Sequence, residues 1–180
     1  MTGPLGRGFS PPHELVAGAA GAILVGGGIG IAPLAMLRRR LAEQGFPTRT
    51  LLGFRDPRHS GGVEELFDCS EVRLASEDGH AGHRGYVTDL LAVMLEGAEA
   101  RSGTVYACGP PAMLEAVRRM CAQADVVAEL ALEAPMACGY GACFGCAVPL
   151  ADGGYMRLCV DGPVVNAAAI ETALVPGSGH

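Results

Sequence analysis

The chain has 180 residues and a net charge of −6, with 49% hydrophobic and 5% aromatic side chains and no tryptophan. This length predicts one domain or slightly more. The acidic balance argues against nucleic acid as a partner, because phosphate binding needs a basic face. Seven cysteines without a signal peptide indicate a reducing, cytoplasmic setting.

Short apolar strands alternate with helices over most of the chain. After a Gly- and Pro-rich linker at 1–12, strands are expected at 22–25, 49–54, 71–75, 104–107 and 126–132, and helices at 33–44, 62–67, 87–97 and 111–123. This alternation predicts an α/β fold, with a five-stranded parallel, Rossmann-like nucleotide-binding domain over 13–133. The composition then changes to Gly, Cys and short apolar pieces, which predicts a small separate module over 134–165. A short helix and a frayed tail are expected at 166–180.

One stretch has the outline of a membrane span. Residues 15–37 carry no charge and are followed by three arginines at 38–40. The glycine cluster at 26–30 and Pro33 would leave the backbone of such a helix unsatisfied in lipid. A buried strand, a glycine turn and a helix account for the same residues better, and no membrane association is expected.

The glycine turn carries the pattern G-x-G-x-x-P at Gly28, Gly30 and Pro33. Glycines let the backbone approach a pyrophosphate, and the following helix N-terminus offers it free N–H groups. A bare structural turn is the alternative, because tight glycine turns are common. Asp56, after the second strand, is placed to meet a ribose hydroxyl and favour NAD, whereas Arg55 beside it argues for NADP.

Cys108, Gly109 and Pro110 end the fourth expected strand, at the edge where open α/β sheets bind ligands. Cys108 is therefore a candidate neighbour of the nicotinamide, or simply a small buried residue before a turn. Cys69 and Cys121 are interpreted as core or half-buried thiols. The H-x2-H pair in the loop at 76–85 is not expected to bind metal.

Four cysteines lie close together in the C-terminal part of the chain, at Cys138, Cys143, Cys146 and Cys159. Their spacing, C-x4-C-x2-C-x12-C, is typical of plant-type [2Fe–2S] clusters, in which four thiolates hold two bridged irons. Zinc is the first alternative, although its structural sites more often pair two C-x2-4-C knuckles. Disulfides are the second, and nothing secretory supports them. The module at 134–165 is therefore predicted to hold a [2Fe–2S] cluster.

In this order, the segments 27–33, 108–113 and 138–159 make the chain resemble the ferredoxin-reductase superfamily. More closely, it is similar to the iron–sulfur, electron-transfer subunit of type B dihydroorotate dehydrogenase. Further matches are Gly3-Pro-Leu-Gly-Arg-Gly-Phe9, Glu77-Asp-Gly79 with Gly85-Tyr-Val-Thr88, and Cys159-Val-Asp-Gly-Pro163. The resemblance covers about residues 3–165.

The resemblance implies electron transfer between NAD(H), FAD, a [2Fe–2S] cluster and the FMN of a partner catalytic subunit that oxidises dihydroorotate in pyrimidine biosynthesis. It implies a heterotetramer, cluster ligation by the four cysteines, and NAD over Gly28, Gly30 and Pro33. Glu77, Asp78 and the segment 108–110 would surround that nucleotide. In the family an FAD-binding β-barrel precedes the motif that here stands at Gly3-Pro-Leu-Gly. The chain is accordingly expected to be a fragment or truncated product, inactive alone.

Two other functions stay open. The first is a flavin-type electron-transfer subunit of a hydrogenase or transhydrogenase complex, whose cysteine motif is alike. Alanines at Ala137 and Ala142, where those relatives tend to carry basic residues, favour the dihydroorotate dehydrogenase family. The second, of another class, is a non-catalytic nucleotide-binding module stapled by zinc.

Overall fold

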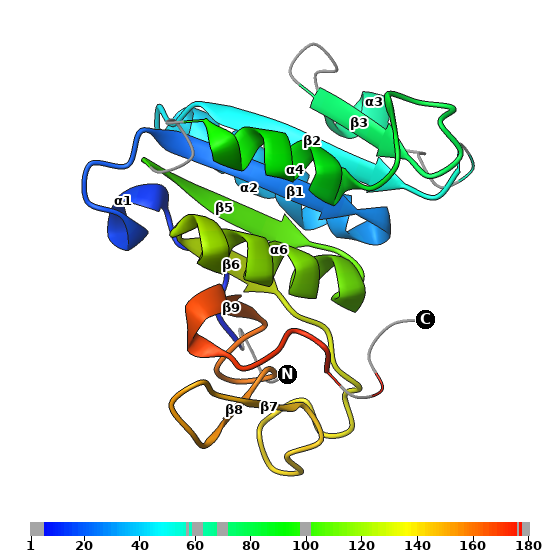
Figure 1. Ribbon diagram of the computed structural model, residues 1–180. Coiled ribbons are helices and arrows are strands. Elements are labelled where there is room, and N and C mark those ends of the chain that lie inside the picture. The colour runs from blue at the N-terminus through cyan, green and yellow to red at the C-terminus, as the bar shows by residue number, and fades with distance from the viewer. Residues whose placement is uncertain are drawn as a thin grey trace.

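A twisted seven-stranded sheet forms the centre of the computed structural model, which describes residues 6–56, 58, 63–67, 72–97, 102–175 and 177 (Figure 1). The strand order is β4-β3-β2-β1-β5-β6-β9, and every neighbouring pair is parallel except β6 with β9. The bounds are β1 Gly21–Gly27, β2 Thr48–Phe54, β3 Val72–Ser76, β4 His83–Arg84, β5 Gly103–Cys108, β6 Ala128–Ala131 and β9 Val164–Asn166.

Helices cover both faces of this sheet. On one face, α2 (Ile31–Glu43) and α3 (Val63–Leu66) bury a cluster around Leu24 and Leu52. On the other face, α4 (Val87–Glu96) and α6 (Pro111–Ala124) bury a cluster around Val25 and Val105. Because β1 is covered on both faces, its residues from Ala22 to Gly27 are all buried, as the continuous apolar run predicts. A short helix, α1 (Pro12–Leu15), precedes the sheet.

The sheet is larger than the five strands expected from the sequence. All five are present and parallel, but β4 and β9 extend the sheet at its two edges. The two-residue strand β4 lies in the segment that we expected to be a loop. It is too short to show the alternation of polar and apolar residues that identifies a strand. The antiparallel strand β9 returns from the cysteine-containing segment and pairs with β6.

Apart from β9, residues 134–175 form short elements beside β6 and β9 at one edge of the sheet (Figure 1). The hairpin of β7 (Ala147–Pro149) and β8 (Tyr155–Arg157) follows the third cysteine, and the 3₁₀ turn η4 (Ala167–Ala169) follows β9. The end of the described chain was expected to fray. Instead Ile170, Ala173 and Val175 are buried, because this segment covers apolar surface beside α6.

The segment before α1 is fixed to the sheet by a buried carboxylate. Ser10 donates hydrogen bonds to Glu129 from its backbone N–H (2.8 Å) and its hydroxyl (2.9 Å), and the Tyr106 hydroxyl donates to the Ser10 carbonyl (2.7 Å). Arg7 forms a backbone bridge to Pro163, next to β9. Residues 7–10 therefore contact both the sheet and the cysteine-containing segment, so they pack more closely than the linker expected at 1–12.

Among the helices that the structure describes, none combines the length and the apolar character needed to cross a bilayer. The uncharged stretch that outlined a membrane span is divided between β1, the 3₁₀ turn η1 (Gly28–Gly30) and α2. The glycine cluster is thus the turn between a buried strand and a surface helix.

Candidate functional site

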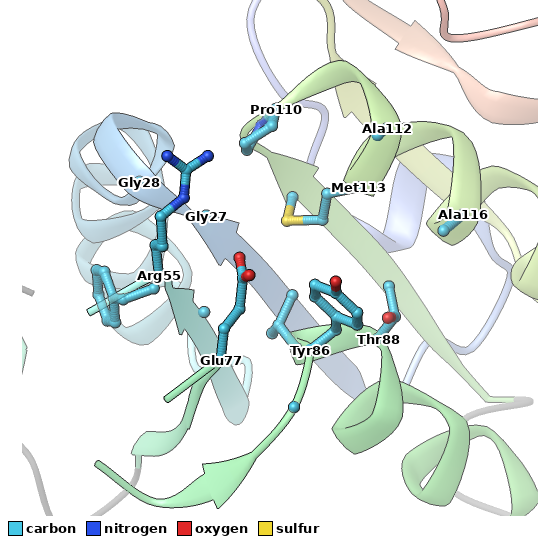
Figure 2. Close-up of a pocket in the computed structure, with 14 residues that line it drawn as sticks. Gly27, Gly28, Arg55, Glu77, Tyr86, Thr88, Pro110, Ala112, Met113 and Ala116 are labelled. Atoms are coloured by element: carbon cyan, nitrogen blue, oxygen red, sulfur yellow. The ribbon is translucent and has the colours of Figure 1, made fainter. Parts of the chain in front are cut away.

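A pocket of about 650 Å³ opens at the carboxyl edge of the sheet, above β1, β2 and β3 and between the first turns of α4 and α6 (Figure 2). Strands β1 and β2 contribute lining residues directly, and the residues that follow β3 and β5 add Glu77 and Pro110. Its lining residues are Gly27, Gly28, Gly53, Phe54, Arg55, Glu77, Gly85, Tyr86, Val87, Thr88, Pro110, Ala112, Met113 and Ala116. Pockets of this size at this edge are typical nucleotide sites of α/β sheets.

The glycine turn meets the end of β5 beneath this pocket. Gly28 lines the pocket, whereas Gly30 is buried and packs against the backbone of Cys108 and Gly109. A Cβ atom at Gly30 would lie 2.3 Å from the Cys108 carbonyl oxygen, so no larger residue fits without moving the turn. Two motifs far apart in the sequence therefore form one surface. Pro33 lies in the first turn of α2, exposed and outside the pocket lining.

The acidic candidates separate into one that lines the pocket and two that do not. Glu77, at the end of β3, lines it. Asp56 instead accepts hydrogen bonds from the Arg58 backbone N–H (2.9 Å) and guanidinium (3.3 Å). Asp78 accepts one from the His80 N–H (3.0 Å), which closes a local turn. Arg55 lines the pocket and makes no side-chain hydrogen bond or ion pair with any described residue.

Of the three residues expected at the end of β5, only Pro110 lines the pocket. Cys108 lies just beneath, half-buried against the glycine turn. Burial, and to a lesser degree the negative charge of Glu133, raise the pKa of its thiol to about 11. At neutral pH this thiol is protonated and is a soft, uncharged neighbour of the pocket.

Sequence reasoning named the segments 85–88 and 108–113 only as parts of the family resemblance, and did not assign Tyr86, Thr88 or Met113 to the site. Tyr86 precedes α4, and its backbone N–H donates to Asp89 (2.8 Å), which also contacts His83 (3.1 Å). This capping box fixes the backbone that carries Tyr86 and Thr88 into the pocket. The spacing of Asp89 three residues after Tyr86 was the available signal. It is weak, because tyrosine is an unusual N-cap residue.

The cysteine loop curls through left-handed backbone positions. Gly139 (φ 74°), Gly141 (φ 85°) and Phe144 (φ 59°) turn backbone N–H groups toward the thiols. The N–H of Cys143 points to Cys138 Sγ (3.4 Å), and that of Gly145 points to Cys143 Sγ (3.4 Å). The Cys143 N–H, followed by that of Tyr140, lowers the pKa of Cys138 to about 6. The loop therefore favours the thiolate of Cys138, the form that binds metals, whereas burial raises the pKa of Cys159.

The four thiols interact with one another. Cys138 interacts with Cys143, and Cys159 interacts most strongly with Cys146 and more weakly with Cys138. The β7–β8 hairpin brings Cys146 and Cys159 together, since the Leu158 N–H donates to the Cys146 carbonyl (3.1 Å). Within the described ranges, no three His, Cys, Asp or Glu side chains gather as ligands of a single metal ion would.

Arg157 fastens the loop to this hairpin. Its guanidinium donates to the Gly141 carbonyl (3.1 Å), lies 5.2 Å from the centre of the Phe144 ring and contacts Asp161 (3.5 Å). The positive charge therefore stands beside the thiol-rich loop. It braces the loop and offsets part of the negative charge that a bound thiolate cluster would carry.

The remaining cysteines and histidines take other roles. Cys121 is buried in the core, which raises the pKa of its thiol to about 12, in agreement with its interpretation as a core thiol. Cys69 lies outside the described residues. His83 contacts Asp89 at the start of α4, whereas His80 donates its backbone N–H to Asp78, so the two histidines have different partners.

Two different family models match the two parts of the chain, the sheet with its helices and the cysteine-containing segment. Residues 24–119 match the sequence profile of the oxidoreductase NAD-binding domain. Residues 133–171 match that of the iron–sulfur cluster binding domain of dihydroorotate dehydrogenase B. The first match covers the sheet and the pocket, and the second covers all four clustered cysteines.

Curated relatives extend the similarity over nearly the whole chain. The chain is 36% identical to the "dihydroorotate dehydrogenase B (NAD(+)), electron transfer subunit" of Listeria monocytogenes over 95% of its own length and 65% of that protein's. It is 39% identical to the subunit of the same name from Bacillus caldolyticus, with coverages of 94% and 64%. The chain thus spans just under two thirds of the length of these relatives.

Among solved structures, the chain is similar to one described as an NADH-dependent reduced ferredoxin-NADP oxidoreductase that performs flavin-based electron bifurcation. The TM-score is 0.79 at 28% identity, over 97% of this chain and 60% of the other. A ferredoxin reductase of carbazole 1,9a-dioxygenase shares the fold, with a TM-score of 0.53 at 23% identity over 61% and 36% of the two chains.

Proposed function

We propose that this chain is an electron-transfer subunit. It belongs to the oxidoreductase NAD-binding domain family, and its residues 133–171 match the iron–sulfur cluster binding domain of dihydroorotate dehydrogenase B. It relays electrons between NAD(H) and the FMN of a dihydroorotate-oxidising partner, in pyrimidine biosynthesis. The names of its curated relatives support this assignment. The observation that carries it is the gathering of four interacting thiols in the same fold as a pocket at the carboxyl edge of the sheet.

The cysteine residues fit a [2Fe–2S] cluster. A two-iron cluster takes two thiolates on each iron and supplies one-electron transfer. Cys138 with Cys143, and Cys146 with Cys159, provide two such pairs. The loop N–H groups hold negative charge at the first pair, and Arg157 keeps the loop in register with the hairpin that carries the second.

The pocket fits a dinucleotide. The glycine turn η1 leads into α2, so free N–H groups at the helix start and the side chain of Arg55 offer positive charge to a diphosphate. Tyr86 and Met113 supply flat and apolar contact surface on the opposite side (Figure 2). We include FAD as a cofactor of the complete relay, because a hydride carries two electrons and a [2Fe–2S] cluster takes one.

The partner we propose is an FMN-containing catalytic subunit in a cytoplasmic heterotetramer. Four large apolar or aromatic side chains are exposed around the cysteine loop and its hairpin: Met136, Tyr140, Phe144 and Tyr155. Aromatic residues and methionine are enriched at protein interfaces. Docking on this face would bring the partner's cofactor near the thiols, since Cys143 itself is exposed.

Metal and sulfide analysis of the anaerobically purified 180-residue polypeptide tests this assignment. We expect about two irons and two acid-labile sulfides per chain. Serine substitution of any of the four clustered cysteines should lower both together. Cys121→Ala is the control, because it removes a buried thiol from the core without touching the loop. One zinc and no sulfide would instead identify a zinc-stapled module.

A second candidate is supported by the TM-score of 0.79 with the electron-bifurcating oxidoreductase. That structure favours a subunit of a transhydrogenase-type complex with a related module arrangement. Co-purification separates the two functions. A dihydroorotate-oxidising FMN protein should be retained by the immobilised chain, whereas retention of a ferredoxin-dependent flavoprotein alone would favour the second.

A further inference from the structure

Arg157 is the only arginine or lysine in the cysteine-containing part of the chain. No other occurs from residue 120 to residue 180, a range that holds all four clustered cysteines. Arg7 approaches this part through its backbone bridge to Pro163, but its guanidinium donates to the Ser10 hydroxyl (3.1 Å). Of the basic residues in its own segment, a negatively charged cluster would therefore have Arg157 alone beside it.

Arg157 also joins the two segments that carry these cysteines. Its guanidinium donates to the carbonyl of Gly141 (3.1 Å), which lies in the loop at 138–143. Its own carbonyl accepts the Asp161 N–H (2.8 Å), which closes the turn that contains Cys159. The side chain and the backbone of one residue thus fix the loop and the turn relative to each other.

The guanidinium is held in place from several sides. Its Nη1 nitrogen faces the Gly141 carbonyl, its Nε nitrogen lies 3.5 Å from the Asp161 carboxylate, and the Phe144 ring lies against it. Asp161 is itself anchored, because it accepts the backbone N–H of Arg157 (3.0 Å). The carboxylate therefore orients the guanidinium without covering the nitrogen that faces the loop. The Arg157 side chain is 34% exposed, so its charge is only partly screened by water.

We propose that Arg157 is a positioning residue that raises the reduction potential of the cluster, and this inference rests on the proposed function. One electron leaves the reduced flavin of the relay and enters the cluster, which gains one negative charge while no bond forms or breaks. The fixed guanidinium stabilises that added charge, so reduction becomes more favourable. Asp161 acts in the opposite direction, because its carboxylate reduces the positive charge beside the loop.

The size of the effect follows from what one fixed charge does to a neighbouring anionic group. An opposite charge nearby shifts an ionisation equilibrium by about one to three powers of ten. Partial exposure to water brings the effect to the lower end of that range. We therefore expect about a tenfold change in the ratio of reduced to oxidised cluster at a fixed potential, which for one electron equals about 59 mV.

The test is a redox titration of the anaerobically purified, iron–sulfur-loaded chain with dithionite, followed by the paramagnetic resonance of the reduced cluster. Arg157→Gln should lower the midpoint potential by the amount that corresponds to about a tenfold change in that ratio. Asp161→Asn should raise it. Arg73→Gln is the matched control, because it removes the same charge from an exposed position on β3, toward the opposite edge of the sheet. It should leave the midpoint unchanged.

Arg157→Lys separates the charge from the brace. Lysine keeps the positive charge but loses the planar fork that spans Gly141 and Asp161. The lysine variant should therefore keep a midpoint close to that of the unmodified protein, yet release its iron to a chelator faster. A lysine variant with the full shift of the glutamine variant would show that the brace, and not the charge, sets the potential.

The outcomes separate this inference from the proposed function. A midpoint that does not change in a loaded Arg157→Gln protein would overturn the inference alone. If Arg157→Gln holds no iron, the other two variants decide: a raised midpoint in Asp161→Asn with an unshifted one in Arg157→Lys supports the inference, and any other combination overturns it. An unmodified chain without a reducible cluster would overturn the proposed function itself.

Discussion

Substitution of Gly141 by alanine should disable the cysteine loop more severely than the same change at Gly139. Both glycines have left-handed φ angles, 85° and 74°. Their surroundings differ, because a Cβ atom at Gly141 would lie 2.8 Å from Val160 Cγ2, whereas one at Gly139 would meet nothing within 4 Å. The pair therefore separates backbone strain from packing in one loop.

The structure gives the size of each effect. A left-handed angle costs a residue with a side chain about 1–2 kcal/mol, and this applies to both variants. Crowding against Val160 adds about 1–3 kcal/mol at Gly141 only, because that residue lies next to Cys159 and cannot retreat without moving it. A difference near 1.4 kcal/mol is a factor of about ten in the population of the competent loop.

The assay is the rate at which each protein loses its iron to an excess of chelator under anaerobic conditions, followed by visible absorbance. Gly141→Ala should release iron about tenfold faster than Gly139→Ala, which in turn should be only moderately faster than the unmodified protein. Equal rates for the two variants would refute the packing between the loop and the segment of Val160. A stable cluster in both would refute the loop geometry as a whole.

Three further predictions concern the rest of the fold. Glu115 is buried between Arg118 and the Ala173 N–H, and the Arg118 hydrogen bond is the largest cause that lowers its pKa from 4.5 to about 2. The folded pKa lies below the unfolded one, so this stabilisation is complete above about pH 5 and is lost as the pH falls toward 2. Glu115→Gln should therefore lower the free energy of unfolding by about 2 kcal/mol at pH 7, less than the full pKa shift implies because Arg119 is solvated. In urea unfolding of the cluster-free proteins, the free energies of unfolding of the variant and the unmodified protein should converge as the pH falls. A loss independent of pH would contradict the ion pair. Burial raises the pKa of Cys108 to about 11, so at pH 8 its thiol should react with iodoacetamide about a hundredfold more slowly in the folded than in the unfolded chain. Peptide mass spectrometry measures both rates, and equal rates would contradict the burial of Cys108. Tyr140→Ser should weaken retention of the FMN subunit about tenfold. Val93 is the matched control, because its side chain is 61% exposed against 64% for Tyr140 but lies on α4, and Val93→Ser should leave retention unchanged. The reverse result would place the docking face on α4 instead of the cysteine loop.

The strand–turn–helix core could be predicted because its signals are local. The apolar run of β1, the glycine turn and the start of α2 are contiguous, and so are the end of β5 and the start of α6. Neighbouring residues alone fix their conformations. The spacing of the four cysteines belongs to the same class, since one short loop and one hairpin carry all of them.

The parts that sequence reasoning missed depend on residues far apart. Glu129 accepts its hydrogen bonds from Ser10, 119 positions away, and Glu115 accepts one from Ala173, 58 positions away. Strand β9 pairs with β6 only after the chain has passed through the whole cysteine module. Asp56 was a reasonable candidate by position, and only the contacts of Arg58 reveal that its carboxylate is occupied. No local pattern encodes such pairings.

Reductive titration tests the central claim most directly. The anaerobically purified chain, titrated with dithionite, should take up about one electron per chain and develop the paramagnetic resonance signal of a reduced [2Fe–2S] cluster, and it should lose both when Cys146 is replaced by serine. No electron uptake by a protein that contains a full complement of metal would contradict the account, because the four paired thiols would then hold a structural ion instead of an electron carrier.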